Sequence, residues 1–171
     1  AYYRLQEDNF DVRVISNNNP TKGIFGIPFR SDLAYEHIKI SQRLGSTNSY
    51  DELVKEYDLL VLIGGVKAIE KVRQEKEFIQ FISNFDNAGK VIASICHGSQ
   101  LLISAKCVQD RYISGYYSIK DDIENAGGHY LDDNAVVSGN IISTAHYKDL
   151  GPWMAATLRI FYERNARLGR L

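Results

Sequence analysis

The amino-acid sequence predicts an α/β fold in which a mostly parallel sheet lies between layers of helices. Two segments, 59–63 and 90–95, are apolar on both alternating faces, as is typical of strands that are covered on both sides. Segments with helical periodicity alternate with the predicted strands, a pattern that favours such a sheet. The chain has 171 residues, 44% of them hydrophobic, so we expect a single domain over 1–171.

Residues in the first third of the chain predict a helix, a strand and a second helix. Residues 2–5 have helical spacing and precede a strand predicted over 11–16. A loop over 17–20 and short extended pieces over 23–40 follow. A short helix is expected over 49–57, with acidic residues near its positive end.

The rest of the chain continues the alternation. An amphipathic helix is expected around 78–85, because its phenylalanines and isoleucine recur at i, i+3, i+4 and i+7, and Gly89 ends it. The later predicted elements are helices over 99–105 and 119–126, a hairpin of 135–137 with 141–143, and a helix that begins near Asp149 and Pro152. This last helix is expected to bury Leu150, Trp153, Met154, Leu158 and Phe161.

The composition argues against several classes of protein. Lys and Arg number 20 and Asp and Glu 21, so the chain lacks the basic excess of a nucleic-acid binder. No apolar run approaches the roughly 20 residues that a membrane span needs. Cys96 and Cys107 are too few for a secreted disulfide scaffold, and we expect a reducing, cytoplasmic setting.

The ends of the two buried strands are where a ligand is expected, since open parallel sheets bind ligands beyond the carboxyl ends of their strands. One strand runs into Gly64-Gly65, where backbone amides can approach a ligand. The other runs into Cys96-His97-Gly98, which has the pattern of a nucleophile elbow with a thiol. A helix that starts there lowers a thiol pKa from about 8.5. The alternative is a buried structural cysteine.

The remaining sequence signals are weaker. Cys107 lies near a predicted helix end without a basic neighbour, and we interpret it as a packing residue. No cluster of His, Cys and Asp has metal-ligand spacing, so we expect no metal and no cofactor. A nucleotide-binding module is disfavoured because Gly64-Gly65 lacks the spacing of a phosphate loop.

The segment Ala93-Ser94-Ile95-Cys96-His97-Gly98-Ser99-Gln100-Leu101-Leu102 resembles the elbow of the PfpI family. These are intracellular cysteine hydrolases of the class I glutamine amidotransferase-like superfamily. Further matching stretches are Tyr3-Arg4-Leu5, Leu62-Ile63-Gly64-Gly65, Glu70-Lys71-Val72-Arg73, 115–122, and Asp149-Leu150 with Trp153-Met154. The resemblance implies a flavodoxin-like three-layer sandwich with a nucleophile elbow.

The resemblance also implies roles for particular residues. Cys96 matches the nucleophile and His97 its base, which an acid from a neighbouring subunit orients in relatives; Glu70 stands at that position. The backbone amides of Gly65 and His97 match the oxyanion hole, and Tyr116 matches an aromatic residue near the pocket. The chain is therefore expected to form a homodimer or a higher homo-oligomer. Without the resemblance, Glu70 would be read as an exposed helix acid paired with Lys or Arg.

Two departures from the family pattern affect these expectations. Relatives begin with a further strand, followed by a Glu that hydrogen-bonds the thiol, and we expect the native protein to be longer than this chain. The segment Thr144-Ala145-His146-Tyr147 also differs from the usual loop. His146 could face Cys96 and compete with His97 as the base. The alternative is a surface-loop histidine.

The predicted function is a cysteine-dependent hydrolase or lyase that acts through Cys96 on a small carbonyl or amide compound. Activities attributed to the family include peptide hydrolysis, deglycation of methylglyoxal adducts and glyoxalase-type hydration. The alternative is a non-catalytic oxidative-stress sensor or protein-stabilising oligomer that uses the same thiol. Contact of Glu70 or His146 with Cys96 or His97 would favour catalysis, whereas solvent exposure of both would favour sensing.

Overall fold

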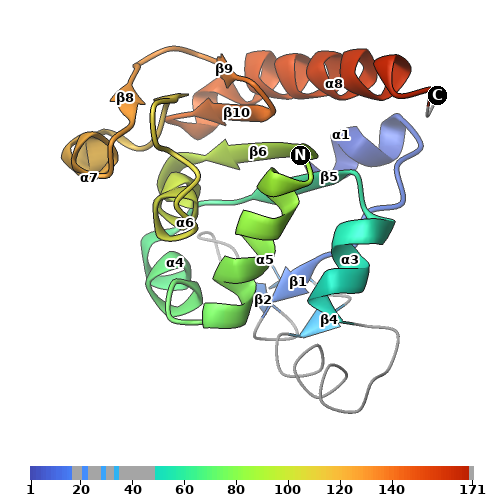
Figure 1. Cartoon of the computed structure of the whole chain (residues 1–171), viewed down its shortest axis with the longest axis horizontal. Helices are drawn as coiled ribbons and strands as arrows, with labels where there is room; N and C mark the ends of the chain where they lie inside the picture. The colour runs from blue at the N-terminus through green and yellow to red at the C-terminus, as the bar shows by residue number, and fades with distance from the viewer. Residues whose placement is uncertain (17–20, 23–27, 30–32, 35–48, 170–171) are drawn as a thin grey trace. The chain divides into compact units, whose positions relative to one another are not determined.

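The computed structural model describes residues 1–16, 21–22, 28–29, 33–34 and 49–169 (Figure 1). The chain divides into two compact units, one over 1–56 and one over 57–171. Each unit is described by itself below. The single domain expected over the whole chain stays a prediction.

The first unit contains short elements. Helix α1 covers Tyr2–Glu7, as predicted. Strand β1 covers only Ile15–Ser16 and pairs in parallel with β4, Leu33–Ala34. The strand predicted over 11–16 is thus too long, because its partner offers only two residues for pairing. Strands β2, Thr21–Lys22, and β3, Pro28–Phe29, form an antiparallel pair, while the loop predicted over 17–20 and much of 23–40 lie outside the described residues.

Helix α3 ends the first unit and covers Tyr50–Glu56, as expected. Its start is a capping box: the N–H of Glu52 donates to Ser49 Oγ at 3.2 Å, and the N–H of Ser49 donates to the Glu52 carboxylate at 3.4 Å. Tyr50 and Leu53 are its buried residues. Two backbone donors at the start of this helix therefore have side-chain acceptors.

The second unit is built on a four-stranded sheet in the order β5-β6-β10-β9. Its strands are β5, Leu59–Leu62; β6, Val91–Ile95; β10, Ile141–Thr144; and β9, Val136–Ser138. The first three are parallel, and β9 is antiparallel to β10 through the predicted hairpin, in which Gly139 has a φ of 65°. Every residue of β6 and β10 is buried, which confirms the flavodoxin-like α/β fold.

Helices cover this sheet (Figure 1). They are α4, Val66–Val72; α5, Lys76–Asn87; α6, Ser99–Ser104; α7, Lys120–Asn125; and α8, Leu150–Arg167. Helix α5 buries the predicted stripe of Phe78, Phe81, Ile82 and Phe85 and packs against β6. Helix α8 packs against β6 and β10, where Trp153 is fully buried and its indole N–H donates to the Ile142 carbonyl at 3.2 Å.

Short elements complete the second unit. They are the 3₁₀ turns η1, Cys96–Gly98; η2, Tyr117–Ile119; and η3, Tyr147–Asp149, together with the parallel strands β7, Tyr112–Ile113, and β8, His129–Tyr130. The turns η1 and η2 carry most of the candidate site.

The start of α8 differs from the prediction. Asp149 is its N-cap residue, but the Asp149 side chain makes no capping hydrogen bond. Leu150 is 37% exposed and Phe161 is half-buried, whereas Trp153, Met154 and Leu158 are buried as expected. Leu150 lies outside the core because the last 3₁₀ turn, η3, leads directly into the helix and places its first residue at the surface.

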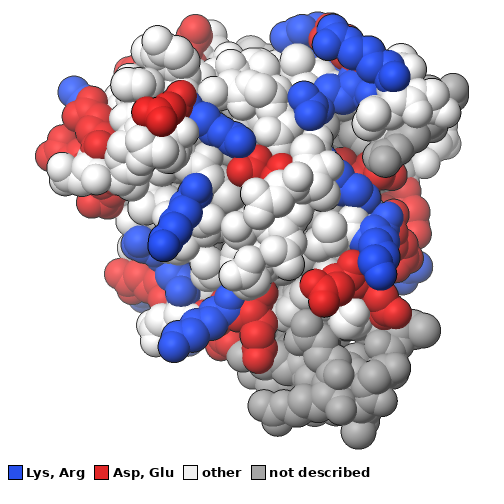
Figure 2. All heavy atoms as spheres, in the orientation of Figure 1, with Lys and Arg blue, Asp and Glu red and all other residues white. Residues whose placement is uncertain are grey.

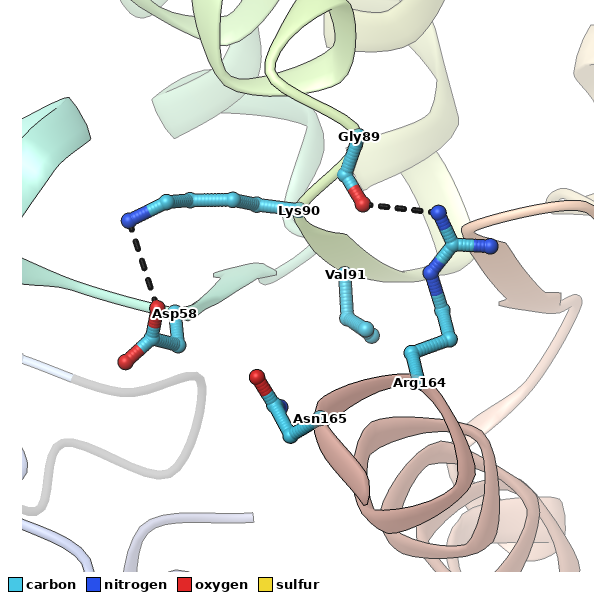
Figure 3. Close-up of a pocket in the computed structure, with 6 residues that line it drawn as sticks. All are labelled: Asp58, Gly89, Lys90, Val91, Arg164 and Asn165. Atoms are coloured by element: carbon cyan, nitrogen blue, oxygen red, sulfur yellow. Dashed lines mark hydrogen bonds and ion pairs between the residues drawn. The ribbon is translucent and has the colours of Figure 1, made fainter. Parts of the chain in front are cut away.

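Charged side chains of both signs are interspersed on the face shown in Figure 2. A small polar pocket at the amino ends of β5 and β6 also pairs opposite charges, since Lys90 Nζ lies 3.3 Å from Asp58 Oδ1 (Figure 3). Arg164 lines the same pocket and donates to the Gly89 carbonyl at 2.9 Å. This pocket lies at the opposite strand ends from Cys96, and its polar groups bind one another.

Candidate active site

Cys96 lies at a strained turn between β6 and the helical segment that follows. The strand ends at Ile95 with extended backbone, and Cys96 then adopts a φ of 60°, in the left-handed region that L-residues other than Asn and Asp rarely enter. Residues Cys96–Gly98 form η1, which continues into α6. A strained strand-to-helix turn of this kind presents a side chain above the sheet edge, as the sequence predicts for Cys96.

Two glycines let the chain pack closely around this turn. A Cβ atom at Gly64 would lie 2.7 Å from the Cβ of Cys96 and 3.0 Å from the Ile95 carbonyl oxygen. A Cβ atom at Gly98 would overlap the carbonyl oxygen of Leu62. The segment after β5 and the turn after β6 therefore interlock at positions where only hydrogen fits.

The Cys96 thiol has three polar neighbours. Its Sγ lies 3.4 Å from Nδ1 of His97, and the backbone N–H groups of His97 and Gly65 hydrogen-bond it. Burial raises the pKa of the Cys96 thiol, and these two backbone N–H groups lower the pKa in part. The expectation of a lowered thiol pKa is therefore wrong for the described residues of this chain, because burial outweighs the amide hydrogen bonds.

The His97 ring is held on two sides. It is 8% exposed and stacks on Tyr116, with the ring centroids 4.8 Å apart. Its Nε2 lies 3.4 Å from Ser118 Oγ. Burial lowers the pKa of His97, so the imidazole is neutral near pH 7. Cys96 and His97 thus form a neutral thiol–imidazole pair rather than an ion pair.

A buried hydroxyl network places the segment that carries Tyr116 and Ser118. The Ser99 hydroxyl donates to the Ser114 carbonyl at 2.7 Å and lies 2.6 Å from the Ser94 hydroxyl. The N–H of Ser114 donates to Ser143 Oγ at 2.8 Å. These serines come from β6, α6 and β10, so three elements hold the start of this segment.

The same segment is tied directly to the cysteine turn. The N–H of Tyr116 donates to the Cys96 carbonyl at 3.2 Å, and the N–H of Ile119 donates to the Tyr116 carbonyl at 2.9 Å. Tyr116, the predicted pocket residue, therefore lies beside His97 through both its backbone and its ring.

Glu70 and His146 make no contact with Cys96 or His97 among the interactions of the described residues. Glu70 is exposed on α4, and only its carbonyl has a printed partner, the side chain of Gln74 at 3.0 Å. His146 accepts a hydrogen bond from the Lys148 N–H through Nδ1 at 3.3 Å. Its ring centroid lies 6.4 Å from that of Tyr116. Within one chain, His97 and not His146 adjoins the thiol.

Cys107 is a packing residue, as predicted. It is 4% exposed, and its thiol donates to the Ala105 carbonyl at 3.5 Å. Burial and the nearby Asp86 carboxylate raise the pKa of Cys107 to about 12. Such a thiol is inert near neutral pH.

Two searches of the described residues found nothing. Within the described ranges, no group of three or more His, Cys, Asp and Glu side chains is arranged to hold a metal ion. Among the helices that the structure describes, none is both long and apolar enough to cross a membrane.

Sequence reasoning missed Ser118, which lies 21 residues from His97 in the chain. A serine in a tyrosine-rich segment carries no chemical signature by itself. The expected pocket at Tyr116 was the signal that could have directed attention to its neighbours.

The fold and the site define a flavodoxin-like α/β protein with a thiol at a strained strand-to-helix turn. The sequence pattern of the DJ-1/PfpI family matches residues 1–160, and the chain belongs to that family. It is 32% identical over 160 residues to Deglycase PfpI of Pyrococcus furiosus, covering 93% of this chain and 87% of that protein. It is 36% identical over 102 residues to Protein/nucleic acid deglycase 2 of Escherichia coli, covering 59% of each chain.

A solved structure shares the same fold. A two-domain protein of Anabaena variabilis, with DJ-1/ThiJ/PfpI-like and ferritin-like domains, superposes with a TM-score of 0.77 and 28% identity. The match covers 96% of this chain and 42% of that longer one.

Proposed function

We propose that the protein is a cysteine-dependent hydrolase or lyase that acts on a small carbonyl or amide compound through Cys96. The observation that carries the proposal is the surroundings of one sulfur atom: two backbone N–H groups and an imidazole nitrogen face it at a strained turn. Relatives named deglycase support activity on adducts of α-oxoaldehydes with amines or thiols. A reducing cytoplasmic setting, which keeps both cysteines as thiols, belongs to the same proposal.

The proposed chemistry begins with proton transfer from the thiol to the imidazole. Nδ1 of His97 accepts the proton while Sγ of Cys96 forms a bond to the substrate carbon. The carbonyl oxygen takes up the electron pair, and the N–H groups of Gly65 and His97 stabilise the resulting oxyanion. These N–H groups already point toward the sulfur, so the donors are in place before the reaction.

The second half of the reaction releases the products. For an amide, the carbon–nitrogen bond breaks and the amine leaves with the proton held on His97. Water then attacks the thioester, gives its proton to the same imidazole, and the thiol is regenerated. Because thiol and imidazole are both neutral at rest, His97 acts as a general base during the attack. A role for Glu70 from a neighbouring subunit stays a prediction, as does the homo-oligomer.

The substrate class is tested with a panel. Purified protein is assayed on short peptide amides, on simple primary amides, and on methylglyoxal adducts of N-acetyllysine and N-acetylcysteine. Turnover of at least one class is expected, with a loss of about 10³-fold or more in Cys96→Ser. Cys107→Ser is the matched control and should keep wild-type turnover, because Cys107 is buried. Equal turnover by Cys96→Ser and wild type would refute the proposal.

An oxidation sensor is the second candidate, and the exposed Glu70 side chain favours it. The raised pKa of Cys96 argues against it, since sensor cysteines have low pKa values that keep them as thiolates. The pH dependence of iodoacetamide alkylation in Cys107→Ser separates the two. A midpoint above about 8.5 supports the hydrolase with its general base, and a midpoint well below that value supports the sensor.

A further inference from the structure

One contact of the site has no part in the chemistry described so far: Nε2 of His97 lies 3.4 Å from Ser118 Oγ. We propose that Ser118 is a positioning residue that holds the His97 imidazole with Nδ1 toward the Cys96 thiol, so that a single chain carries the whole Cys96–His97–Ser118 relay. The inference rests on the proposed function, because it assigns Ser118 a part in the same reaction.

The number of protons on the ring supports this role. A neutral imidazole carries one N–H, and the nitrogen that lacks it is the only one that can accept a proton. Nδ1 faces the sulfur, so Nδ1 must be unprotonated for His97 to act as a base. The proton then lies on Nε2, and Ser118 Oγ is the acceptor within reach of Nε2. The hydroxyl thereby selects the tautomer that the reaction needs.

The position of Ser118 is fixed by its own segment. Ser118 lies in η2, directly after Tyr116 and Tyr117. The N–H of Tyr116 donates to the Cys96 carbonyl, and the Tyr116 ring stacks on His97. The same short segment therefore contacts the cysteine turn, the face of the imidazole and its Nε2 edge. Small shifts of the segment would move all three contacts together.

A serine differs from an acid in what it does to the ring. A carboxylate at Nε2 would raise the pKa of His97 and favour an imidazolium–thiolate pair. A neutral hydroxyl accepts the N–H without adding charge, which agrees with the lowered pKa of the buried His97. Ser118 and an acid from another subunit would also compete for one N–H. If Ser118 holds that proton, Glu70 is dispensable for turnover.

Kinetics with matched variants test the assignment on the full chain. Ser118→Ala is expected to lower kcat about threefold to tenfold, the worth of one neutral hydrogen bond, while KM stays within about twofold. Ser118→Thr keeps the hydroxyl and should restore kcat to within about twofold of wild type. Ser83→Ala, a half-buried serine on α5, is the control and should leave kcat unchanged.

Nitrogen-15 NMR of histidine-labelled protein gives a readout that does not depend on turnover. Wild-type His97 is expected as the Nε2–H tautomer, and Ser118→Ala is expected to raise the Nδ1–H fraction. An unchanged tautomer with unchanged kcat in Ser118→Ala would overturn the assignment, and so would a failure of Thr to rescue. A large loss in Glu70→Gln beside normal turnover in Ser118→Ala would overturn it as well. If wild type turns over no substrate of the panel, the proposed function fails, while the tautomer still tests Ser118.

Discussion

The sulfur of Cys96 lies 3.4 Å from Nδ1 of His97, its neighbour in the chain, at a turn where Cys96 has a φ of 60°. Consecutive residues rarely present their side chains to each other in a strand or a helix, because successive side chains point in different directions. The positive φ of Cys96 and the 3₁₀ turn that follows bring the two groups together. The turn is therefore the feature on which the site depends, and the predictions below test the residues that hold it.

Gly64→Ala should destabilise the protein and lower its activity together. The added methyl would lie 2.7 Å from the Cys96 Cβ, so the turn must shift, at a cost of about 1–3 kcal/mol in the free energy of unfolding. Gly151→Ala is the control, because a Cβ there meets no atom within 4 Å and Gly151 lies in α8. Urea titration should show Gly151→Ala as stable as wild type or more so; a Gly64→Ala protein of wild-type stability would contradict the close packing.

The Tyr116 ring should matter for its aromatic face rather than for its hydroxyl. Tyr116 stacks on His97 at 4.8 Å, and an aromatic contact of this kind contributes about 0.5–1.5 kcal/mol. Tyr116→Leu is therefore expected to lower kcat by about twofold to tenfold, whereas Tyr116→Phe should stay near wild type. Steady-state kinetics on the best substrate of the panel measure both. Equal losses in the two variants would assign the effect to the hydroxyl instead.

Ser99→Ala should loosen the segment that carries Tyr116 and Ser118. Ser99 is fully buried and donates to the Ser114 carbonyl, so its removal leaves buried polar groups without a partner at a cost of about 1–3 kcal/mol. Ser83→Ala, away from this network, should change the free energy of unfolding by less than about 0.5 kcal/mol. Denaturation of the two variants side by side measures the difference, and similar values for both would argue against the network.

Cys107 should make the protein less stable at alkaline pH. Its folded pKa is raised to about 12, so its contribution is complete below the unfolded value of about 8.5 and is lost as the pH rises toward the folded value. The unfolded chain then releases a proton that the folded chain keeps, which lowers the free energy of unfolding by about 1–2 kcal/mol between about pH 7.5 and 10.

Comparison with Cys107→Ala isolates this effect from other titrations. The variant lacks the thiol, so the stability difference between wild type and variant should narrow by the same amount over that pH range. A difference that stays constant with pH would mean that Cys107 ionises equally easily in the folded and the unfolded chain.

Local pattern was enough to predict much of the fold, and three-dimensional contacts account for what it missed. Segment 90–95 was predicted as a buried strand because its side chains are apolar on both faces, and the stripe at 78–85 was predicted from its period. The length of β1 and the exposure of Leu150 depend on partners elsewhere in the chain. Periodicity carries no information about such partners.

The candidate site shows the same division. The turn at Cys96 could be predicted because a buried strand runs into a glycine-containing segment. The direction of its pKa could not, because it depends on how much water the folded chain removes from the thiol. The contact between His97 and Ser118 joins residues 21 positions apart through a 3₁₀ turn, and no local pattern predicts it.

The central claim is that Cys96 is a nucleophile, and a burst experiment tests it most directly. Rapid mixing with p-nitrophenyl acetate is expected to release about one p-nitrophenolate per chain before the steady state, since an acyl-enzyme accumulates at the thiol. Cys107→Ser should keep the burst and Cys96→Ser should lose it, with the acetyl group found by mass spectrometry on the peptide that contains Cys96. A burst of wild-type size in Cys96→Ser, or linear release from wild type without an acetylated Cys96, would contradict the claim.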